Sequence, residues 1–145
     1  DKKDSCTIEY AAAYGLKKIK KLERTFEFTR TESDKPNSLT VIDVVEFEQT
    51  ATFETALLTY ESWEKQSNSS NQVDENKIDL LIGAKDKKIR VVVTATVDGK
   101  SLPLKLETIE IDEDALAKKK PTRLSFKIEK PITNAKIITE ITPQN

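Results

Sequence analysis

Strict alternation of apolar and polar residues, in runs of seven to ten residues, is the feature that most limits what this chain can fold into. In residues 88–97, for example, Ile89, Val91, Val93 and Ala95 all fall on one face. Successive side chains of a β-strand point to opposite faces, so a period of two predicts a strand that is buried on one side. An amphipathic helix needs a period near 3.6. We therefore expect an all-β protein.

Eight runs of this kind follow one another, and turn-forming residues separate most of them. Asp98-Gly99 is typical of a tight hairpin turn, and Pro103 predicts an edge position or the start of a strand. No helical crossover is expected between the strands. These features predict a two-sheet antiparallel β-sandwich of about eight strands, with a closed β-barrel as the alternative. The expected strands are residues 22–31, 39–48, 53–60, 77–83, 88–97, 102–111, 123–129 and 135–142.

The sequence does not decide between helix and strand for residues 1–20. Ala11, Ala12 and Ala13 favour a helix, whereas the alternation of Ile8 and Tyr10 is compatible with a strand. Length and composition fit one domain over residues 1–145, because the 145 residues include 38 Leu, Ile, Val and Phe, enough for a core. The 24 basic and 25 acidic residues nearly balance, and no long apolar run is present. Neither nucleic acid nor a membrane is therefore expected as a partner.

The residue types that are missing exclude several kinds of chemistry. The sequence contains no His, so it supplies no imidazole base and no His-containing zinc site. Cys6 is the single thiol and has no His to activate it. The three Gly residues lie too far apart to build a phosphate-binding loop, and no acidic run has the ligand number of a calcium site. We expect no catalytic residue, no cofactor and no metal ion.

Two groups of residues are candidates for carbohydrate binding. The first is basic: Lys17, Lys18, Lys20 and Lys21 alternate with apolar residues in a pattern associated with sulfated polysaccharides. In a helix these lysines would form a cationic stripe, but in a strand they would divide between two faces. The alternative is an ordinary solvated segment.

The second group is aromatic. Tyr60 and Trp63 could offer rings on which sugars stack, or Trp63 could simply close one end of the sandwich core. Asp43 is a separate case, because it falls on the same predicted face as Val41 and Val45. A buried carboxylate without a partner is costly, so we expect Asp43 to have a structural role, either bonded to the backbone of a neighbouring strand or at the end of the buried stretch.

Four segments together resemble a known family. An Ala-Tyr element at residues 8–14 precedes a Lys-rich stretch and an Arg-containing strand at 23–26. A strand with Asp after β-branched residues follows at 39–47, and a further strand at 52–60. This series resembles the start of the C-terminal β-domain of heparinase II/III-like polysaccharide lyases, and the resemblance is clearest over residues 8–63.

The resemblance implies a function as well as a fold. Lyases of this family cleave uronic-acid-containing polysaccharides by β-elimination, with catalytic residues in a helical toroid and a central β-domain. None of the segments that match is catalytic, so the chain is expected to be a non-catalytic sandwich that contacts the remainder of the parent lyase and supports its substrate cleft. Acidic polysaccharide is then a further expected partner, and the periplasm or the exterior of a bacterium the expected location. The alternatives are an autonomous carbohydrate-binding module and a bacterial surface or adhesion sandwich.

Overall fold

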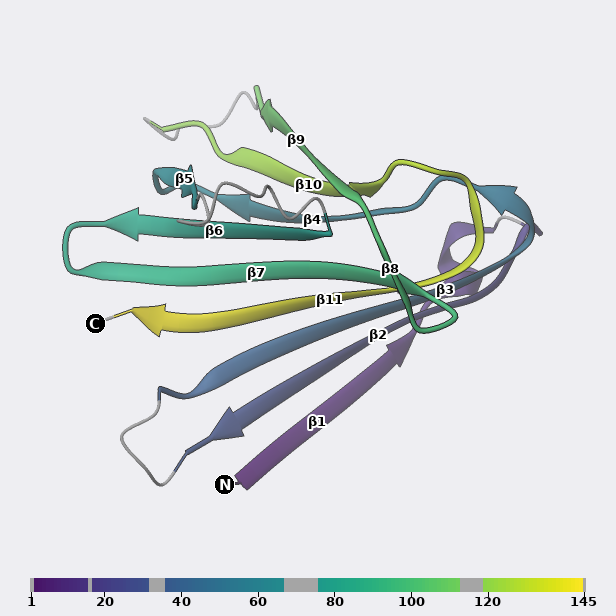
Figure 1. The fold of residues 1–145 in the computed structure, drawn as a ribbon, viewed down its shortest axis with the longest axis horizontal. Coiled ribbons are helices and arrows are strands. Elements are labelled where there is room, and N and C mark those ends of the chain that lie inside the picture. Colours follow the sequence, from purple (N-terminus) through teal and green to yellow (C-terminus); the bar gives the residue numbers. More distant parts are fainter. Residues whose placement is uncertain (1, 16, 32–35, 67–75, 113–118, 145) are drawn as a thin grey trace.

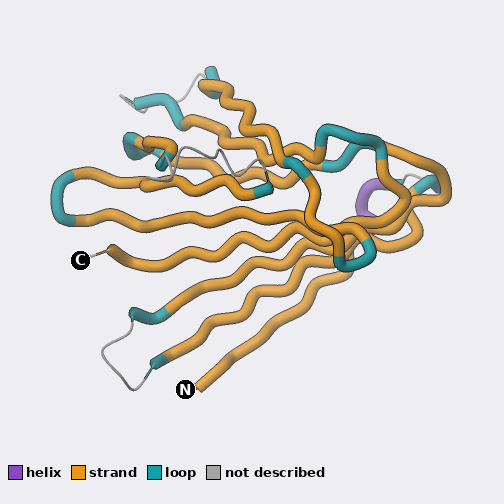
Figure 2. Tube along the Cα trace, in the orientation of Figure 1, coloured by secondary structure: helices purple, strands orange, loops and turns teal. Residues whose placement is uncertain are grey.

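The computed structural model describes residues 2–15, 17–31, 36–66, 76–112 and 119–144, and within them nearly all regular structure is strand (Figures 1 and 2). One short 3₁₀ helix, η1 (Ala11–Tyr14), interrupts the strands. The strands are β1 (Lys2–Glu9), β2 (Ile19–Arg30), β3 (Ser38–Ala51), β4 (Glu54–Thr59), β5 (Trp63–Lys65), β6 (Lys77–Ala84), β7 (Lys87–Val97), β8 (Lys100–Leu102), β9 (Leu104–Glu110), β10 (Thr122–Ile128) and β11 (Ile132–Gln144).

The strands form two antiparallel sheets of unequal size, as expected for a sandwich rather than a closed barrel. The large sheet has eight strands in the order β1-β2-β3-β11-β7-β6-β5, with β8 paired to β7. The small sheet has three strands in the order β4-β10-β9. Figure 1 shows the strands of the large sheet side by side from β1 to β6, with β9 and β10 above them.

All eight expected strands are present, and the structure adds detail at Pro103. The expected strand at residues 102–111 is split there into β8, which belongs to the large sheet, and β9, which belongs to the small sheet. Proline has no N–H for a ladder bond, so it suits the point where the chain leaves one sheet for the other. Strand β9 is also an edge strand, as Pro103 predicted.

The first twenty residues, left open by the sequence, contain both kinds of structure. Strand β1 pairs with β2, and the alanines form η1. Gly15 then ends η1 with a φ of 60°, in the left-handed region that glycine enters at little cost. Strand β2 begins at Ile19, and the backbone N–H of Tyr10 donates to the carbonyl of Leu22 on that strand, which holds Tyr10 beside it.

The Asp98-Gly99 hairpin is confirmed. Asp98 and Gly99 have φ values of 50° and 76°, and they connect the paired residues Val97 and Lys100. Positive φ at both central residues gives a turn whose twist matches that of the flanking strands. At Gly83 both the backbone conformation and the available space require glycine, because its φ is 128° and an added Cβ would lie 2.2 Å from the carbonyl oxygen of Lys87.

The core lies between the two sheets and follows rows of directly paired residues. One row crosses β2, β3, β11, β7 and β6 through Phe28, Leu39, Ile141, Val91 and Leu80. Leu80 and Val91 are completely buried, Ile141 and Leu39 are partly buried, and Phe28 is 40% exposed. Burial thus decreases along the row because the three-stranded sheet covers only part of the eight-stranded one.

The uncovered part of this inner face carries apolar side chains. Ile8, on β1, is 49% exposed and pairs with Arg24, and Phe26 and Phe28 continue the same face on β2. We call Ile8, Phe26, Phe28 and Leu39 the open face. Ile8 and Phe28 are exposed, and Phe26 and Leu39 are half-buried. Apolar residues that lie together on a sheet and keep part of their surface in water are typical of a surface that another part of a protein covers.

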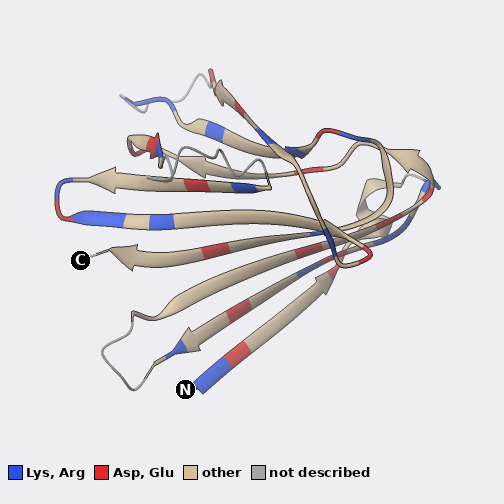
Figure 3. Ribbon diagram, viewed as in Figure 1, with Lys and Arg blue, Asp and Glu red and all other residues tan. Residues whose placement is uncertain are grey.

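Figure 3 shows basic and acidic residues distributed over the strands of both sheets. Many form exposed pairs, such as Lys3 with Glu27 at 2.8 Å and Lys105 with Glu107 at 3.1 Å. Among the residues that the structure describes, there is no helix of the length and apolarity that a membrane crossing requires.

Candidate functional site

A part-buried ion pair between β2 and β3 of the large sheet also contacts the small sheet. Asp43 is 1% exposed and points inward from β3, between Val41 and Val45. Arg24, its direct neighbour on β2, donates from Nε to Asp43 Oδ1 at 2.6 Å and from Nη2 to Oδ2 at 3.1 Å. The same Nη2 donates to Thr55 Oγ1 on β4 at 2.9 Å, so one guanidinium connects the large sheet to the small sheet. The sequence predicted the structural role of Asp43, but not this partner.

Tyr10 adds a third group to this pair. Its backbone N–H donates to the carbonyl of Leu22 at 2.9 Å, which fixes the residue against β2. Burial of the ring, and next the negative charge of Asp43, raise the pKa of Tyr10 above its ordinary value. The hydrogen bond to Asp43 in turn raises the pKa of Arg24. Both groups therefore keep their protons at neutral pH, and neither is suited to act as a base.

A hollow of about 520 Å³ opens beside this cluster. Its deeper walls are apolar and come from both sheets, with Leu22 and Val45 on the large sheet and Phe53 just before β4. The polar lining comes from Tyr10, Tyr14, Lys18, Arg24, Thr52, Glu54, Thr55 and Arg123. This size, and an apolar wall with a few polar groups, are typical of ligand pockets. The segments that carry the family resemblance all contribute to this hollow.

Arg123, the other arginine that lines the hollow, forms an ion pair with Glu54. Arg123 Nη2 donates to Glu54 Oε1 at 2.7 Å, and Nη1 donates to the hydroxyl of Ser125. Glu54 is the one carboxylate among the lining residues, and this bond satisfies it. Lys18, in contrast, makes no ion pair within the described ranges, and it is exposed.

The four lysines of the predicted basic group do not form one surface. The pairing of β2 with β3 shifts register between Ile19 and Lys21, and this irregularity separates the neighbouring lysines. Lys18 lines the hollow described above, whereas Lys20 lines another hollow together with Val44, Thr96 and Asn134. Lys21 forms an ion pair with Glu23 at 3.3 Å, and Lys17 lies in the exposed turn before β2.

The aromatic pair lies far from the lysines. Strand β4 begins beside the hollow at Glu54, and its six residues span about 20 Å before the chain reaches Tyr60. Tyr60 is 49% exposed, whereas Trp63 is partly buried and packs against the core. The six residues predicted to bind carbohydrate are thus not brought together, and their role stays a prediction.

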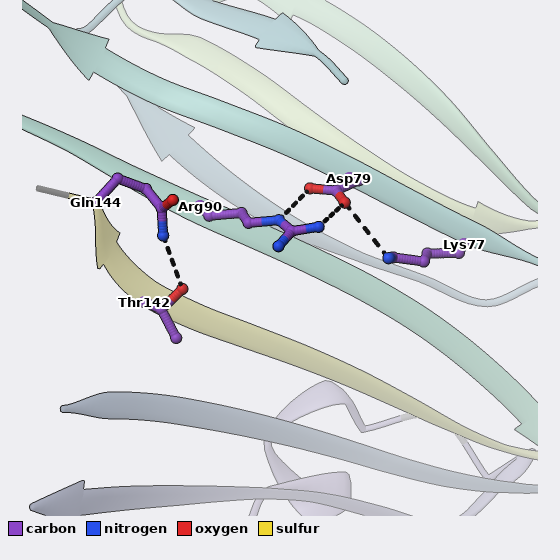
Figure 4. Close-up of polar contacts among 5 residues, drawn as sticks. All are labelled: Lys77, Asp79, Arg90, Thr142 and Gln144. Carbon is purple, nitrogen blue, oxygen red and sulfur yellow. Dashed lines mark hydrogen bonds and ion pairs between the residues drawn. The ribbon is translucent and has the colours of Figure 1, made fainter. Parts of the chain in front are cut away.

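A second charged cluster, which the sequence reasoning missed, lies on the outer face of the large sheet (Figure 4). Asp79 on β6 is only 4% exposed, and Arg90 on β7 donates to its carboxylate from Nε at 2.9 Å and from Nη2 at 2.5 Å. Lys77 adds a contact at 3.4 Å. The hydrogen bond from Arg90 lowers the pKa of Asp79, despite the opposing effect of burial. Counting back from the Lys85-Asp86 turn would have placed Asp79 diagonal to Arg90.

Comparison with known proteins finds matches among solved structures but none at the level of sequence. No family model matches the sequence, and no curated protein is similar to it at the sequence level. Among solved structures, heparinase III matches with a TM-score of 0.61 and 16% identity. The chain shares its fold with one part of heparinase III. The match covers 99% of this chain and 20% of that one.

A second heparinase III structure, with methylated lysines, gives a TM-score of 0.58 at the same 16% identity and the same coverage. The chain thus spans about a fifth of the length of the heparinase III chains it matches. Within the described ranges, no three His, Cys, Asp or Glu side chains are grouped closely enough to hold a metal ion.

Proposed function

We propose that this chain is a non-catalytic β-sandwich domain of a larger polysaccharide-lyase-like protein and that its role there is structural. The observation that carries the proposal is the match to heparinase III over 99% of this chain but only 20% of that protein. The open face supports it independently. An apolar surface made of Ile8, Phe26, Phe28 and Leu39 is costly to leave in water, and the rest of the parent protein would cover it.

The chemistry of the described site favours a non-catalytic role. A tyrosine that removes a proton at neutral pH needs a lowered pKa, whereas that of Tyr10 is raised. Arg24 is held by Asp43, and no His is present in the sequence to share the acid and base work. The expected result is that the purified chain folds but releases no unsaturated uronate product from heparin, heparan sulfate or alginate. Appearance of that product would overturn the non-catalytic assignment.

Cys6 offers a direct test of the covered surface. It is the one thiol of the chain, it is exposed, and it pairs with Phe26 on the open face. We expect Cys6 to react readily with a maleimide in the isolated chain and at least about tenfold more slowly in the longer protein, because a covered thiol is inaccessible to the reagent. Peptide mapping by mass spectrometry would separate Cys6 from any other thiol. Equal rates in the two proteins would refute the docking surface.

The proposal extends to the context of the parent protein. The domain would lie at its C-terminal end, beside a central β-domain and a helical toroid, and the protein would be exported to the periplasm or the bacterial exterior. The reading frame around this chain tests these points. A long upstream helical region and an export signal are expected, and a start codon immediately before residue 1 would refute them.

A further inference from the structure

We infer that the outer edge of β1 pairs with the same edge of a second copy of this chain. The two β1 strands run antiparallel about a two-fold axis, so that the large sheets of the two copies join into one. This edge lies in the plane of the sheet, and its pairing leaves the open face free for another part of a larger protein. The pairing therefore does not depend on the proposed function.

Strand β1 is a long edge that is accessible on its outer side. It lies at one end of the large sheet, and among the described residues only β2 pairs with it (Figure 1). All eight of its residues are exposed. The N–H and C=O groups along such an edge are a template for another strand. Strand β5, the edge at the other end of the sheet, has only three residues.

Two usual protections of an edge strand are missing from β1. Proline and β-bulges interrupt many edges, but β1 contains no proline and pairs with β2 from Lys2 to Glu9 without a register shift. Charged residues are a third protection, because like charges repel a second copy. Here, however, Lys2 and Lys3 lie near one end of the strand and Glu9 at the other. An antiparallel second copy therefore meets opposite charges.

Two-fold symmetry limits the register of this pairing. The axis is perpendicular to the sheet, so facing residues lie on the same side of it, and one residue must face its own copy. With Cys6 at the axis, Lys3 faces Glu9 of the second copy, and Glu9 faces Lys3 of the second copy. Moving the axis to Ser5 or Thr7 removes both of these pairings. Charge complementarity therefore selects Cys6.

The groups that meet on the outer face in this register are able to bond. The carboxylate of Glu9 accepts one backbone N–H, at 2.9 Å, and has further lone pairs. Lys3 Nζ lies 2.8 Å from Glu27, but its side chain is 54% exposed and an ammonium has three donors. Ser5 of each copy faces Thr7 of the other, and facing hydroxyl residues also stabilise strand pairs.

The inner face adds little to the contact. Ile8 comes to lie beside Asp4 of the second copy, and that carboxylate is bonded to Arg30 of its own chain. The contact thus consists mainly of main-chain hydrogen bonds, as in other cases of strand addition. Its area is small, so we expect a weak dimer with a Kd on the order of 100 µM.

The first test is a charge reversal measured by sedimentation equilibrium. Lys3→Glu places Glu opposite Glu9, and Glu9→Lys places Lys opposite Lys3, so each variant alone should have a Kd at least about tenfold above that of the wild type. An equimolar mixture of the two variants restores both pairings of opposite charge and should dimerise about as well as the wild type. Lys105→Glu makes the same charge change on β9 and should leave the Kd unchanged.

The second test uses Cys6 to report the register. Facing residues of antiparallel strands have Cα atoms about 4.5 to 5.5 Å apart, which a disulfide can span. A copper(II)-phenanthroline oxidant, which accepts the two electrons, should therefore join the two Cys6 thiols at protein concentrations near the Kd. In the control variant, Ser5→Cys with Cys6→Ser, the two thiol positions lie about 8 Å apart, too far for a disulfide. The maleimide reaction of Cys6 is run far below the Kd, where the chain is a monomer.

Three results would overturn the inference. The first is a wild-type chain that stays monomeric up to about 1 mM, tenfold above the expected Kd, which would leave the edge to a strand of a different protein. The second is a mixture of the reversed variants that associates no better than either variant alone. Lys3 and Glu9 lie on the outer face, so that result would assign any association to the open face. The third is equal cross-linking of Cys6 and of the control thiol.

Discussion

Replacing Arg24 by Met tests whether a single guanidinium holds the two sheets together. The substitution removes two bonds to Asp43, of 2.6 and 3.1 Å, and one to Thr55, of 2.9 Å. Asp43 is 1% exposed, so water replaces the lost donors incompletely, and removing one partner of a buried pair costs about 3 to 5 kcal/mol. Because Arg24 itself is a third exposed, we expect the lower end, about 3 kcal/mol.

The measurement is the free energy of unfolding in urea, with Arg30→Met as the control. Arg30 lies on the same strand and pairs with Asp4, but both side chains are more than half exposed, so its loss should cost less than about 1 kcal/mol. The double variant Arg24→Met with Asp43→Leu should recover much of the loss, because it leaves no buried charge. If Arg24→Met and Arg30→Met lose the same stability, Asp43 does not depend on Arg24 and the reasoning is wrong.

Three further predictions follow from other parts of the structure. Asp79→Asn should cost roughly 2 kcal/mol at pH 7, because Arg90 loses a charged partner. Since the pKa of Asp79 is lowered by folding, the wild-type chain should lose this contribution as the pH falls below the ordinary Asp range, whereas the variant should show a flatter acid profile in the same unfolding assay. Gly83→Ala should lower the free energy of unfolding by more than about 2 kcal/mol, because the added Cβ would clash with the backbone. Gly99→Ala places its Cβ in open space and should lower the free energy of unfolding by about 1 kcal/mol. Equal losses of the two variants in thermal unfolding would contradict this. We expect the isolated chain to self-associate through the open face, and Phe28→Ser should reduce this association in light scattering at a stability loss of about 2 kcal/mol, because the side chain is 40% exposed and its remainder is buried. Unchanged association would show that the open face does not mediate it.

Strand positions and the faces of their side chains were readable from the sequence. The alternation of Val41, Asp43 and Val45 placed all three on one buried face, and Asp98-Gly99 marked a hairpin. These properties are local, because the geometry of a strand fixes a period of two and the turn depends on two adjacent residues. A buried Asp in such a run also indicated that some partner must exist.

The assembly of the site depended on contacts between residues distant in sequence. Arg24 meets Thr55 because the chain leaves the large sheet after β3 and returns above it as β4, and no local pattern encodes that crossing. Alternation already predicted that the lysines would divide between two faces if they lay in a strand, but the register shift opposite β3, between Ile19 and Lys21, depends on how two strands pair and not on the composition of either one. Alternation therefore determined that the chain would form sheets with one apolar side. Only the packing of three strands over eight decided which polar groups meet in the hollow and which apolar ones stay uncovered, because that result depends on the relative areas of the two sheets.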